Sequence, residues 1–381
     1  MKILVTGGAG FIGSHLVDAL VQKGHTVRVL DVLEPQVHGG KKPAYLNPKA
    51  EYLWGDVRDR KLLRGALEGA EAVFHEAAQV GVGQSMYEIE RYMDHNVLGT
   101  AILLDVLVNE RLRPRKLVVA SSMSIYGEGG YRCAGCGPVY PSIRSEEQMR
   151  RRQWEMSCPR CGQPASPAPT SEEKPLAPTS IYAVSKRDQE ESVLAVGRAY
   201  GIPSVALRYF NVYGPRQALS NPYTGVCAIF SARIKNGNPP LIFEDGLQSR
   251  DFVHVSDVVQ ANLLALESPK ANDQALNVGT GRPTTVLDIA RTLAKLYTAP
   301  LAGTGHPAPH PVDPQIAQKF RGGDIRHCTA DISKIQALGF RPRVALEEGL
   351  RELVEWGQGV EAVDRVDGAA RELEKRGLTL G

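Results

Sequence analysis

The sequence has no long apolar run and almost no excess of charge of either sign. Across 381 residues, 45 Lys and Arg face 42 Asp and Glu, which gives a formal net charge of +3. Such a charge does not favour nucleic acid or an anionic membrane as a partner. No run approaches the ~20 apolar residues of a membrane span, and the N-terminal run is too short for a secretory signal. We expect a cytoplasmic protein that binds neither nucleic acid nor membrane.

Aromatic residues and cysteines are also scarce. Aromatic residues make up 6% of the chain, but a hydrophobic content of 43% with 23% charge is ordinary for a globular protein. The length suits two domains, or one domain with a large second lobe. Four of the six cysteines lie in two Cys-x-x-Cys pairs within 29 residues. In a reducing compartment such clustering indicates metal binding before disulfides.

The N-terminus carries a glycine-rich turn in the context that a dinucleotide site requires. The run Gly7-Gly-Ala-Gly10-Phe-Ile-Gly13 follows an apolar strand at 2–6 and opens an apolar-periodic helix. Glycines there allow a tight turn and a close approach to a pyrophosphate, and the helix N-terminus supplies N–H groups. A second strand ends at Asp31, whose carboxylate suits a ribose diol and repels a 2′-phosphate, so NAD is favoured over NADP. The other residues expected at the cofactor are Phe11, Ile12, Asp56, Val57, Ala77, Ala78 and Asn96.

Strands and helices alternate through the first half of the chain. Further strands are expected at 51–54, 72–75, 117–120 and 204–207, with helices at 60–67, 88–110 and 180–200. This alternation predicts an α/β protein with a Rossmann-like, doubly wound parallel sheet. The expected division is an NAD-binding domain at 1–207, to which 249–268 returns, a smaller C-terminal substrate-binding domain at 208–248 and 269–360, an insertion at 128–178, and a tail at 361–381. The proline-rich stretch 299–314 predicts a loop.

Tyr182 and Lys186 are four residues apart, which places both side chains on one face of the expected helix. A nearby cation favours the ionised phenol and lowers its pKa from about 10. Tyr182 would then serve as a general base for a substrate hydroxyl. The alternative is a helix that happens to carry both residue types.

Seven motifs in one order give the chain a resemblance that extends from Met1 to about Trp356. It resembles the extended short-chain dehydrogenases/reductases of the NAD-dependent nucleotide-sugar epimerase/dehydratase family, including UDP-glucose 4-epimerase-like and dTDP-hexose 4-epimerase-like members. The motifs are Thr6-Gly-Gly-Ala-Gly-Phe-Ile-Gly13, Ser121-Ser122 with Tyr126-Gly127, Tyr182-Ala-Val-Ser-Lys186, Arg208-Tyr-Phe-Asn211, Arg250-Asp251, Asn277-Val-Gly279 and Arg321-Gly-Gly-Asp324.

The resemblance implies roles for individual residues. It implies that Ser122 hydrogen-bonds the reacting oxygen, that Tyr182 is the base, and that Lys186 holds the nicotinamide ribose. It also implies a homodimer formed through the helices at 88–110 and 180–200. The residues expected at the substrate are Ser85, Ser122, Ser124, Tyr182, Asn211, Arg250, Arg321 and Asp324. The two arginines suit phosphate, although each would also pair with a surface carboxylate.

The two residues after Ser122 reduce the number of reactions that the site is expected to catalyse. Dehydratases that resemble this chain carry an acid there, whereas Met123 and Ser124 cannot transfer a proton in that way. The leading hypothesis is therefore epimerisation at C4 of a UDP- or dTDP-hexose through a transient 4-keto intermediate. A 4-ketoreductase or dehydrogenase, a uronic-sugar decarboxylase, and a Rossmann protein that binds without catalysis are the alternatives.

The insertion between Tyr126-Gly127 and Tyr182 holds Cys133, Cys136, Cys158 and Cys161. They form two Cys-x-x-Cys pairs, or knuckles, separated by 21 residues. This pattern predicts a four-cysteine structural Zn²⁺ site with no open position for catalysis. The segment is too small to bury its own core, so metal would supply folding energy. A disulfide pair and idle surface thiols are the alternatives. Its position fits either a lid over the sugar or an oligomer contact.

Overall fold

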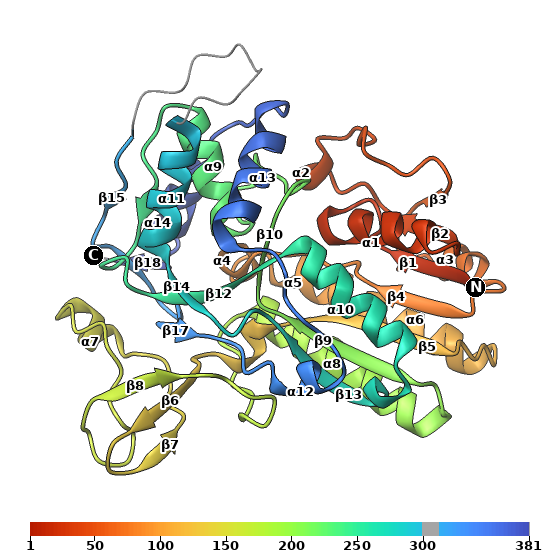
Figure 1. Cartoon of the computed structure of the whole chain (residues 1–381), viewed down its shortest axis with the longest axis horizontal. Helices are drawn as coiled ribbons and strands as arrows, with labels where there is room; N and C mark the ends of the chain where they lie inside the picture. Colours follow the sequence, from red (N-terminus) through yellow and green to blue (C-terminus); the bar gives the residue numbers. More distant parts are fainter. Residues whose placement is uncertain (299–311, 381) are drawn as a thin grey trace.

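The computed structural model describes residues 1–298 and 312–380, so most of the predicted proline-rich loop at 299–314 lies outside the described residues. A seven-stranded sheet with the order β13-β9-β5-β4-β1-β2-β3 forms the centre, and every neighbouring pair in it is parallel (Figure 1). Its strands are β1 (Lys2–Thr6), β2 (Thr26–Asp31), β3 (Glu51–Trp54), β4 (Ala72–His75), β5 (Lys116–Ser122), β9 (Ser204–Tyr209) and β13 (Gln274–Val278).

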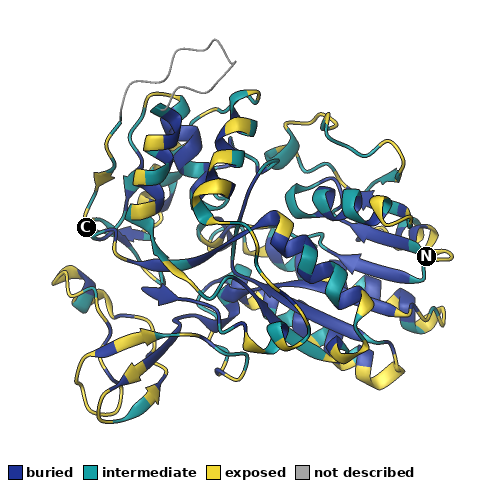
Figure 2. Ribbon diagram, viewed as in Figure 1, coloured by how far each residue is buried: buried dark blue, intermediate teal, exposed yellow. Residues whose placement is uncertain are grey.

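Helices cover both faces of this sheet, which is why its strands are almost continuously apolar. On one face, α1 (Phe11–Gln22) and α10 (Val255–Glu267) pack against alternate strand residues such as Val5 and Val29. On the other face, α3 (Arg60–Leu67), α6 (Gly99–Asn109) and α8 (Ile181–Tyr200) cover Leu4, Leu30 and Val119. Figure 2 shows the sheet as the buried centre of the molecule. The predicted Rossmann-like, doubly wound parallel sheet is confirmed.

A smaller lobe follows in the second half of the chain. Three helices, α9 (Val226–Lys235), α11 (Val286–Thr298) and α13 (Leu346–Gln358), enclose an apolar cluster that includes Phe230, Leu293 and Leu353. Beside them lies a sheet of β10 (Asn211–Tyr213), β12 (Ser249–His254), β14 (Pro283–Thr285) and β17 (His327–Cys328). Two short pairs complete the lobe: β11 (Leu241–Ile242) with β15 (Gln315–Ile316), and β16 (Phe320–Arg321) with β18 (Thr379–Leu380).

Two strands lie in a different lobe from the one their sequence position suggested. The structure places β12 in the smaller sheet, although 249–268 was expected to return to the first domain as a unit. It places β13 at the edge of the central sheet, although 269–360 was expected in the second domain. The reason is the crossover β9–α10–β13, which joins parallel strands through a helix on the sheet. The chain thus returns to the first lobe after β12 and leaves it again after β13, in both cases later than the sequence indicated.

The insertion forms a small antiparallel sheet at the side of the molecule, with much of its outer surface exposed (Figures 1 and 2). Its elements are β6 (Gly130–Cys133), β7 (Gly137–Val139), α7 (Glu146–Arg150) and β8 (Ala165–Ala168). Its own buried cluster is limited to Tyr131, Cys133, Val139, Met156, Cys158 and Ala165. So small a core fits the expectation that the insertion needs a metal to fold.

The helix predicted at 88–110 consists of three consecutive segments. They are α5 (Ile89–Tyr92), a π-helical turn η1 (Met93–Leu98) and α6. The remaining elements are α2 (Pro35–His38), α4 (Val82–Ser85), η2 (Met123–Tyr126), η3 (Pro269–Ala271), α12 (Ser333–Ala337) and α14 (Val366–Lys375). Within residues 1–298 and 312–380, none of these helices combines the length and apolar character needed to cross a bilayer.

Candidate active site

A cavity of about 440 Å³ opens at the carboxyl ends of the parallel strands. Its walls come from the glycine turn, the ends of β2, β4, β5 and β9, the first turns of α8, and the loop before α9. In open α/β sheets, ligands bind at this edge, because the loops and helix N-termini there present unpaired N–H groups. The cavity is therefore the candidate site for both cofactor and substrate.

Besides Tyr182 and Lys186, ten of the residues predicted to bind the dinucleotide line this cavity. They are Gly7, Gly10, Phe11, Ile12, Gly13, Asp31, Asp56, Val57, Ala77 and Ala78. A Cβ on Gly7, which has φ +70°, would lie 2.7 Å from the backbone nitrogen of Ala77, and one on Gly13 would lie 2.2 Å from the Gly7 carbonyl oxygen. Both distances are below van der Waals contact, so only glycine allows the turn to lie this close to the sheet.

Asp31 is held by the backbone around it. Its carboxylate accepts hydrogen bonds from the N–H groups of Ala9, at 2.9 Å, and Leu33, at 2.8 Å. These contacts fix the carboxylate at the cavity wall where β2 ends. A fixed negative charge at this place disfavours an additional phosphate on the ribose.

Asn96 and Ser85 do not line the cavity, contrary to the direct contacts expected of them. The Asn96 amide bonds both backbone groups of Gln79, at 2.7 and 3.1 Å, and the Ser185 hydroxyl at 2.9 Å. The Ser85 hydroxyl accepts from the N–H of Tyr182 at 3.0 Å. Both are fully buried and support the cavity wall from behind. Sequence position alone does not show which way a side chain points.

Ser122, Tyr182 and Lys186 all line the cavity. Ser122 is the last residue of β5, and Tyr182 lies in the first turn of α8, where the Ser180 hydroxyl caps the helix by accepting from Ala183 N–H at 3.1 Å. Lys186 lies one turn further along the helix and donates to the carbonyl oxygen of Ala120 at 2.8 Å. Strand β5 therefore holds both the serine and the ammonium group.

The pKa of Tyr182 differs from the expectation that the Lys186 ammonium group would lower it. Burial raises the pKa of Tyr182, and the neighbouring Ser122 hydroxyl acts in the opposite direction. Burial lowers the pKa of Lys186 to about 8, and the charge of Glu76 partly offsets this. The groups around Tyr182 in the protein thus do not bring its pKa below the ordinary value.

Glu76 is a cavity residue that the sequence analysis missed. It lies directly after β4, lines the cavity, and accepts a hydrogen bond from the Tyr209 hydroxyl at 2.8 Å. Burial raises the pKa of Glu76 to about 7, while Tyr209 and the charge of Lys186 act to lower it. The sequence did carry a signal for Glu76, because this acid stands between the buried strand β4 and the small residues Ala77 and Ala78, which line the cavity.

The predicted substrate residues fall into two groups. Ser124 and Asn211 line the cavity. The buried Oδ1 of Asn211 and the buried Oε1 of Gln217, another lining residue, have no hydrogen-bond partner among the described residues. Buried polar atoms are seldom left unpaired, so both atoms are available to accept a hydrogen bond from a ligand or from water.

Arg250, Arg321 and Asp324 lie outside the cavity. The Arg250 guanidinium donates to the carbonyl oxygens of Ser249, Ile325 and Arg326 at 2.7 to 3.0 Å. Arg321 pairs with Asp324 at 2.8 Å, which is the alternative that the sequence left open for such arginines. All three stand together in the smaller lobe.

The four insertion cysteines are brought together as predicted. Their sulfur atoms all lie within 4.8 Å of one another, and those of Cys133 and Cys161 are 3.6 Å apart. That separation is far above a disulfide bond of about 2.05 Å. It is close to the ~3.8 Å between sulfurs in a tetrahedron with Zn–S bonds of about 2.3 Å. The donor set and its spacing therefore fit zinc.

The fold and the cavity define a class: a dinucleotide-dependent enzyme of the short-chain dehydrogenase/reductase type. A model of the NAD dependent epimerase/dehydratase family matches residues 3–143 and 155–279. The chain belongs to this family. The break in the match falls inside the insertion.

Known proteins are similar over nearly the whole chain. A dTDP-L-rhamnose 4-epimerase of Burkholderia thailandensis is 36% identical over 359 residues, covering 93% of this chain and 94% of the relative. The structure of UDP-glucose 4-epimerase from Thermotoga maritima with UDP-glucose has a TM-score of 0.72 and 33% identity, covering 94% of this chain and 99% of the other. That of Thermus thermophilus UDP-glucose 4-epimerase with NAD has a TM-score of 0.72 and 31% identity, covering 95% and 100%. These relatives agree with the predicted isomerase class and support NAD as cofactor.

Proposed function

We propose that this chain is an NAD-dependent nucleotide-sugar epimerase that inverts C4 of a UDP- or dTDP-hexose. The observation that carries the proposal is that Ser122, Tyr182 and Lys186 share one cavity with the glycine turn, with no acid at the two positions after Ser122. That set can remove and return a proton on a sugar hydroxyl. It lacks the acid that loss of water would require.

The chain's own residues account for proton transfer at the sugar. Tyr182 takes the proton of the 4-hydroxyl, and Ser122 donates a hydrogen bond to the same oxygen as the carbonyl forms. The Ser124 hydroxyl donates to Ser122 at 3.0 Å, which leaves the Ser122 hydrogen free to point at the substrate. When bound, NAD supplies the hydride acceptor and a positively charged ring. That charge and Lys186 together oppose the effect of burial on the Tyr182 pKa.

The keto sugar must then present its other face before hydride returns. The unpaired oxygens of Asn211 and Gln217 lie on the cavity wall, where they can accept hydrogen bonds from sugar hydroxyls. We assign Arg250, Arg321 and Asp324 to the nucleotide side of the substrate, because they cluster in the smaller lobe. Their ion pairs and carbonyl contacts would be exchanged for contacts to phosphate and ribose.

A panel of UDP- and dTDP-hexoses incubated with the purified protein tests the reaction. We expect one sugar to convert to its C4 epimer, seen by chromatography of the nucleotide sugars, without net change in NAD. Stoichiometric oxidation of added NADH would instead identify a 4-ketoreductase, and release of CO₂ from a uronic sugar would identify a decarboxylase. Conversion of no member of the panel would contradict the proposal.

We also propose that Cys133, Cys136, Cys158 and Cys161 bind one structural Zn²⁺ and that the protein is a homodimer. The exposed apolar side chains Ile89, Leu98 and Val184 support the dimer, because they lie on the helical segments 89–109 and α8. Single apolar residues on a surface are ordinary, but several on adjacent helices favour an interface. Analytical ultracentrifugation that finds only monomer at micromolar concentration would contradict the dimer.

A further inference from the structure

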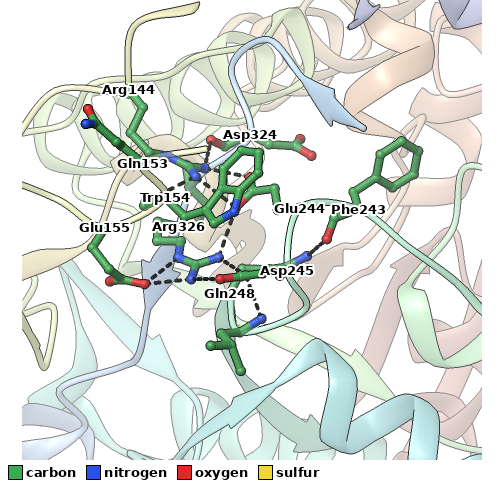
Figure 3. Close-up of polar contacts among 12 residues, drawn as sticks. Arg144, Gln153, Trp154, Glu155, Phe243, Glu244, Asp245, Gln248, Asp324 and Arg326 are labelled. Atoms are coloured by element: carbon green, nitrogen blue, oxygen red, sulfur yellow. Dashed lines mark hydrogen bonds and ion pairs between the residues drawn. The ribbon is translucent and has the colours of Figure 1, made fainter. Parts of the chain in front are cut away.

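A cluster of charged side chains joins the insertion to the smaller lobe (Figure 3). Its members are Arg144, Glu155, Glu244, Asp245 and Arg326. We call it the buried charge cluster because its two arginines and Glu244 are buried, whereas Asp245 is 31% and Glu155 61% exposed at its edge. Arg326 has no exposed side-chain surface and donates to Glu155 at 2.6 and 3.0 Å, to Asp245 at 2.7 and 2.9 Å, and to Glu244 at 3.0 Å. Arg144 binds both oxygens of Glu244 at 2.8 Å.

These five residues come from three separate segments. Arg144 and Glu155 belong to the insertion, Glu244 and Asp245 follow β11, and Arg326 precedes β17. Burial of a charge costs several kcal/mol unless partners compensate it. The guanidinium groups of Arg144 and Arg326 reach these carboxylates only when all three segments are in place. The cluster therefore fixes the insertion against both segments of the smaller lobe.

The two ends of the insertion are bound to the same lobe through the backbone. Near its start, the Glu128 carboxylate accepts from the N–H groups of Arg326, at 2.7 Å, and His327, at 2.8 Å. Near its end, Thr170 N–H donates to the Thr329 carbonyl at 2.8 Å, and the Thr170 carbonyl accepts from Asp331 N–H at 3.0 Å. The insertion thus has a side-chain anchor and two backbone anchors on residues 326–331.

The segments that the insertion holds also carry the nucleotide-side residues. The carbonyl oxygens that orient Arg250 belong to Ile325 and Arg326. Arg144 also donates to the Asp324 carbonyl oxygen at 3.0 Å. The Arg321 guanidinium lies 4.8 Å from the ring centre of Phe243, the residue before Glu244. The insertion therefore contacts Asp324 directly and Phe320, the residue before Arg321. It reaches Arg250 through Arg326, whose carbonyl oxygen binds Arg250 and whose side chain binds Glu155.

The cysteine site lies close to this contact in the chain. Glu155 is followed by Met156 and Cys158, both part of the insertion's small core, and Trp154 packs edge-on against Phe320 at 6.2 Å between ring centres. Order at the two Cys-x-x-Cys pairs thus determines where Glu155 lies. Without that order, Arg326 would lose its contact with the Glu155 carboxylate.

We propose that the cysteine-bearing insertion is a positioning module for the nucleotide end of the substrate, acting through the buried charge cluster on Arg250, Arg321 and Asp324. The inference rests on the proposed nucleotide-sugar function. It separates the two ends of the site: affinity for a nucleoside diphosphate depends on the contacts of the buried charge cluster, whereas NAD binding at the glycine turn and proton transfer at Tyr182 do not depend on those contacts.

The test compares Glu155→Gln with the matched control Glu147→Gln. Both are Glu-to-Gln changes in the insertion, but among the residues that the structure describes Glu147 pairs only with Arg151, the exposed residue that directly follows its helix. Titration calorimetry of the NAD-loaded, zinc-replete proteins with UDP and with dTDP measures the affinity of the nucleotide end. We expect Glu155→Gln to weaken binding about three- to tenfold, the range in which residues without ligand contact modulate affinity. Glu147→Gln should bind as the unaltered protein does.

The possible results distinguish failure of the proposed function from failure of the positioning role alone. If the unaltered protein binds neither UDP nor dTDP, the proposed function is wrong. If Glu155→Gln binds the nucleotide as tightly as Glu147→Gln, only the positioning role is overturned. A rise in KM for the sugar nucleotide with kcat and NAD content unchanged supports it, whereas an equal fall in kcat and NAD content means general damage and counts against it. Arg144→Lys, which keeps the charge but not the two-pronged contact, gives a second variant with the same readouts if Glu155→Gln does not fold.

Discussion

Glu76 allows a test of the electrostatics of the cavity through the substitution Glu76→Gln. Because burial raises the pKa of Glu76 to about 7, the folded protein keeps this proton over a pH range where the unfolded chain, with an ordinary pKa of 4.5, loses it. Folding therefore binds a proton between these values, and stability falls as pH rises through that window. Gln cannot ionise and keeps an oxygen for the Tyr209 hydroxyl.

The magnitude follows from the two pKa values. A shift from 4.5 to about 7 corresponds to about 3 kcal/mol, at roughly 1.4 kcal/mol per pH unit. An unfolding entropy of about 2 cal/mol/K per residue gives ~0.8 kcal/mol/K for a chain of this length, so Tm should change by ~4 °C. We expect Glu76→Gln to match the unaltered protein near pH 4.5, to gain stability steadily above it, and to level off about 4 °C higher beyond pH 7.

Thermal unfolding of nucleotide-free protein from pH 4.5 to 8.5 measures this difference. Glu267→Gln is the control, because Glu267 pairs with Lys23 at the surface and is 54% exposed. Its effect should stay within about 0.5 kcal/mol at every pH. A constant difference for Glu76→Gln would show that Glu76 does not titrate in this window. A variant that becomes less stable at pH 8 would refute the reasoning, because pairing with Lys186 would then lower the pKa of Glu76 in the folded protein instead of burial raising it.

Three further substitutions test the site. Tyr182→Phe should lower turnover about a hundred- to ten-thousandfold with bound NAD unchanged, as expected for loss of a general base; near-normal turnover would remove that role. Asp31→Asn should narrow the preference for NAD over NADP about tenfold, in line with the loss of a charged hydrogen bond, measured as a ratio of dissociation constants; an unchanged ratio would contradict the assignment. Cys136→Ser should lower zinc to well below one per chain by elemental analysis and make the insertion sensitive to limited proteolysis, because a structural site needs its full ligand set; zinc equal to that of the unaltered protein would contradict the site.

The features that the sequence predicted well are local ones. The glycine turn, the strand–helix alternation and the Tyr182–Lys186 pair each lie within a few residues, so spacing and residue type were enough. The cysteine cluster was predicted equally well, because each Cys-x-x-Cys pair is a short local motif. Sheet membership was harder: β12 and β13 are both short strands, and only the path of the chain in space shows which sheet each one joins.

The direction of side chains and long-range pairing could not be predicted. Asn96 and Ser85 lie at the expected place in the chain but do not line the cavity, because their side chains bond Gln79, Ser185 and the backbone of Tyr182. Arg326 meets Glu155 and Asp245 across separations of 171 and 81 residues, for which no spacing rule exists. The same holds for the raised pKa of Glu76, which depends on burial and not on sequence neighbours.

The position of the insertion along the chain bears on how the enzyme matures in the cell. The glycine turn precedes the insertion, whereas Ser122 and Tyr182 stand on either side of it, 60 residues apart. If the cysteines hold zinc as proposed, a newly made chain starved of zinc would still acquire its dinucleotide, yet would have to bring serine and tyrosine together across an unordered connection. Protein made in metal-depleted cultures should therefore carry NAD but turn over little substrate until zinc is restored. Metal supply would then control the assembly of the catalytic residues without taking part in the reaction.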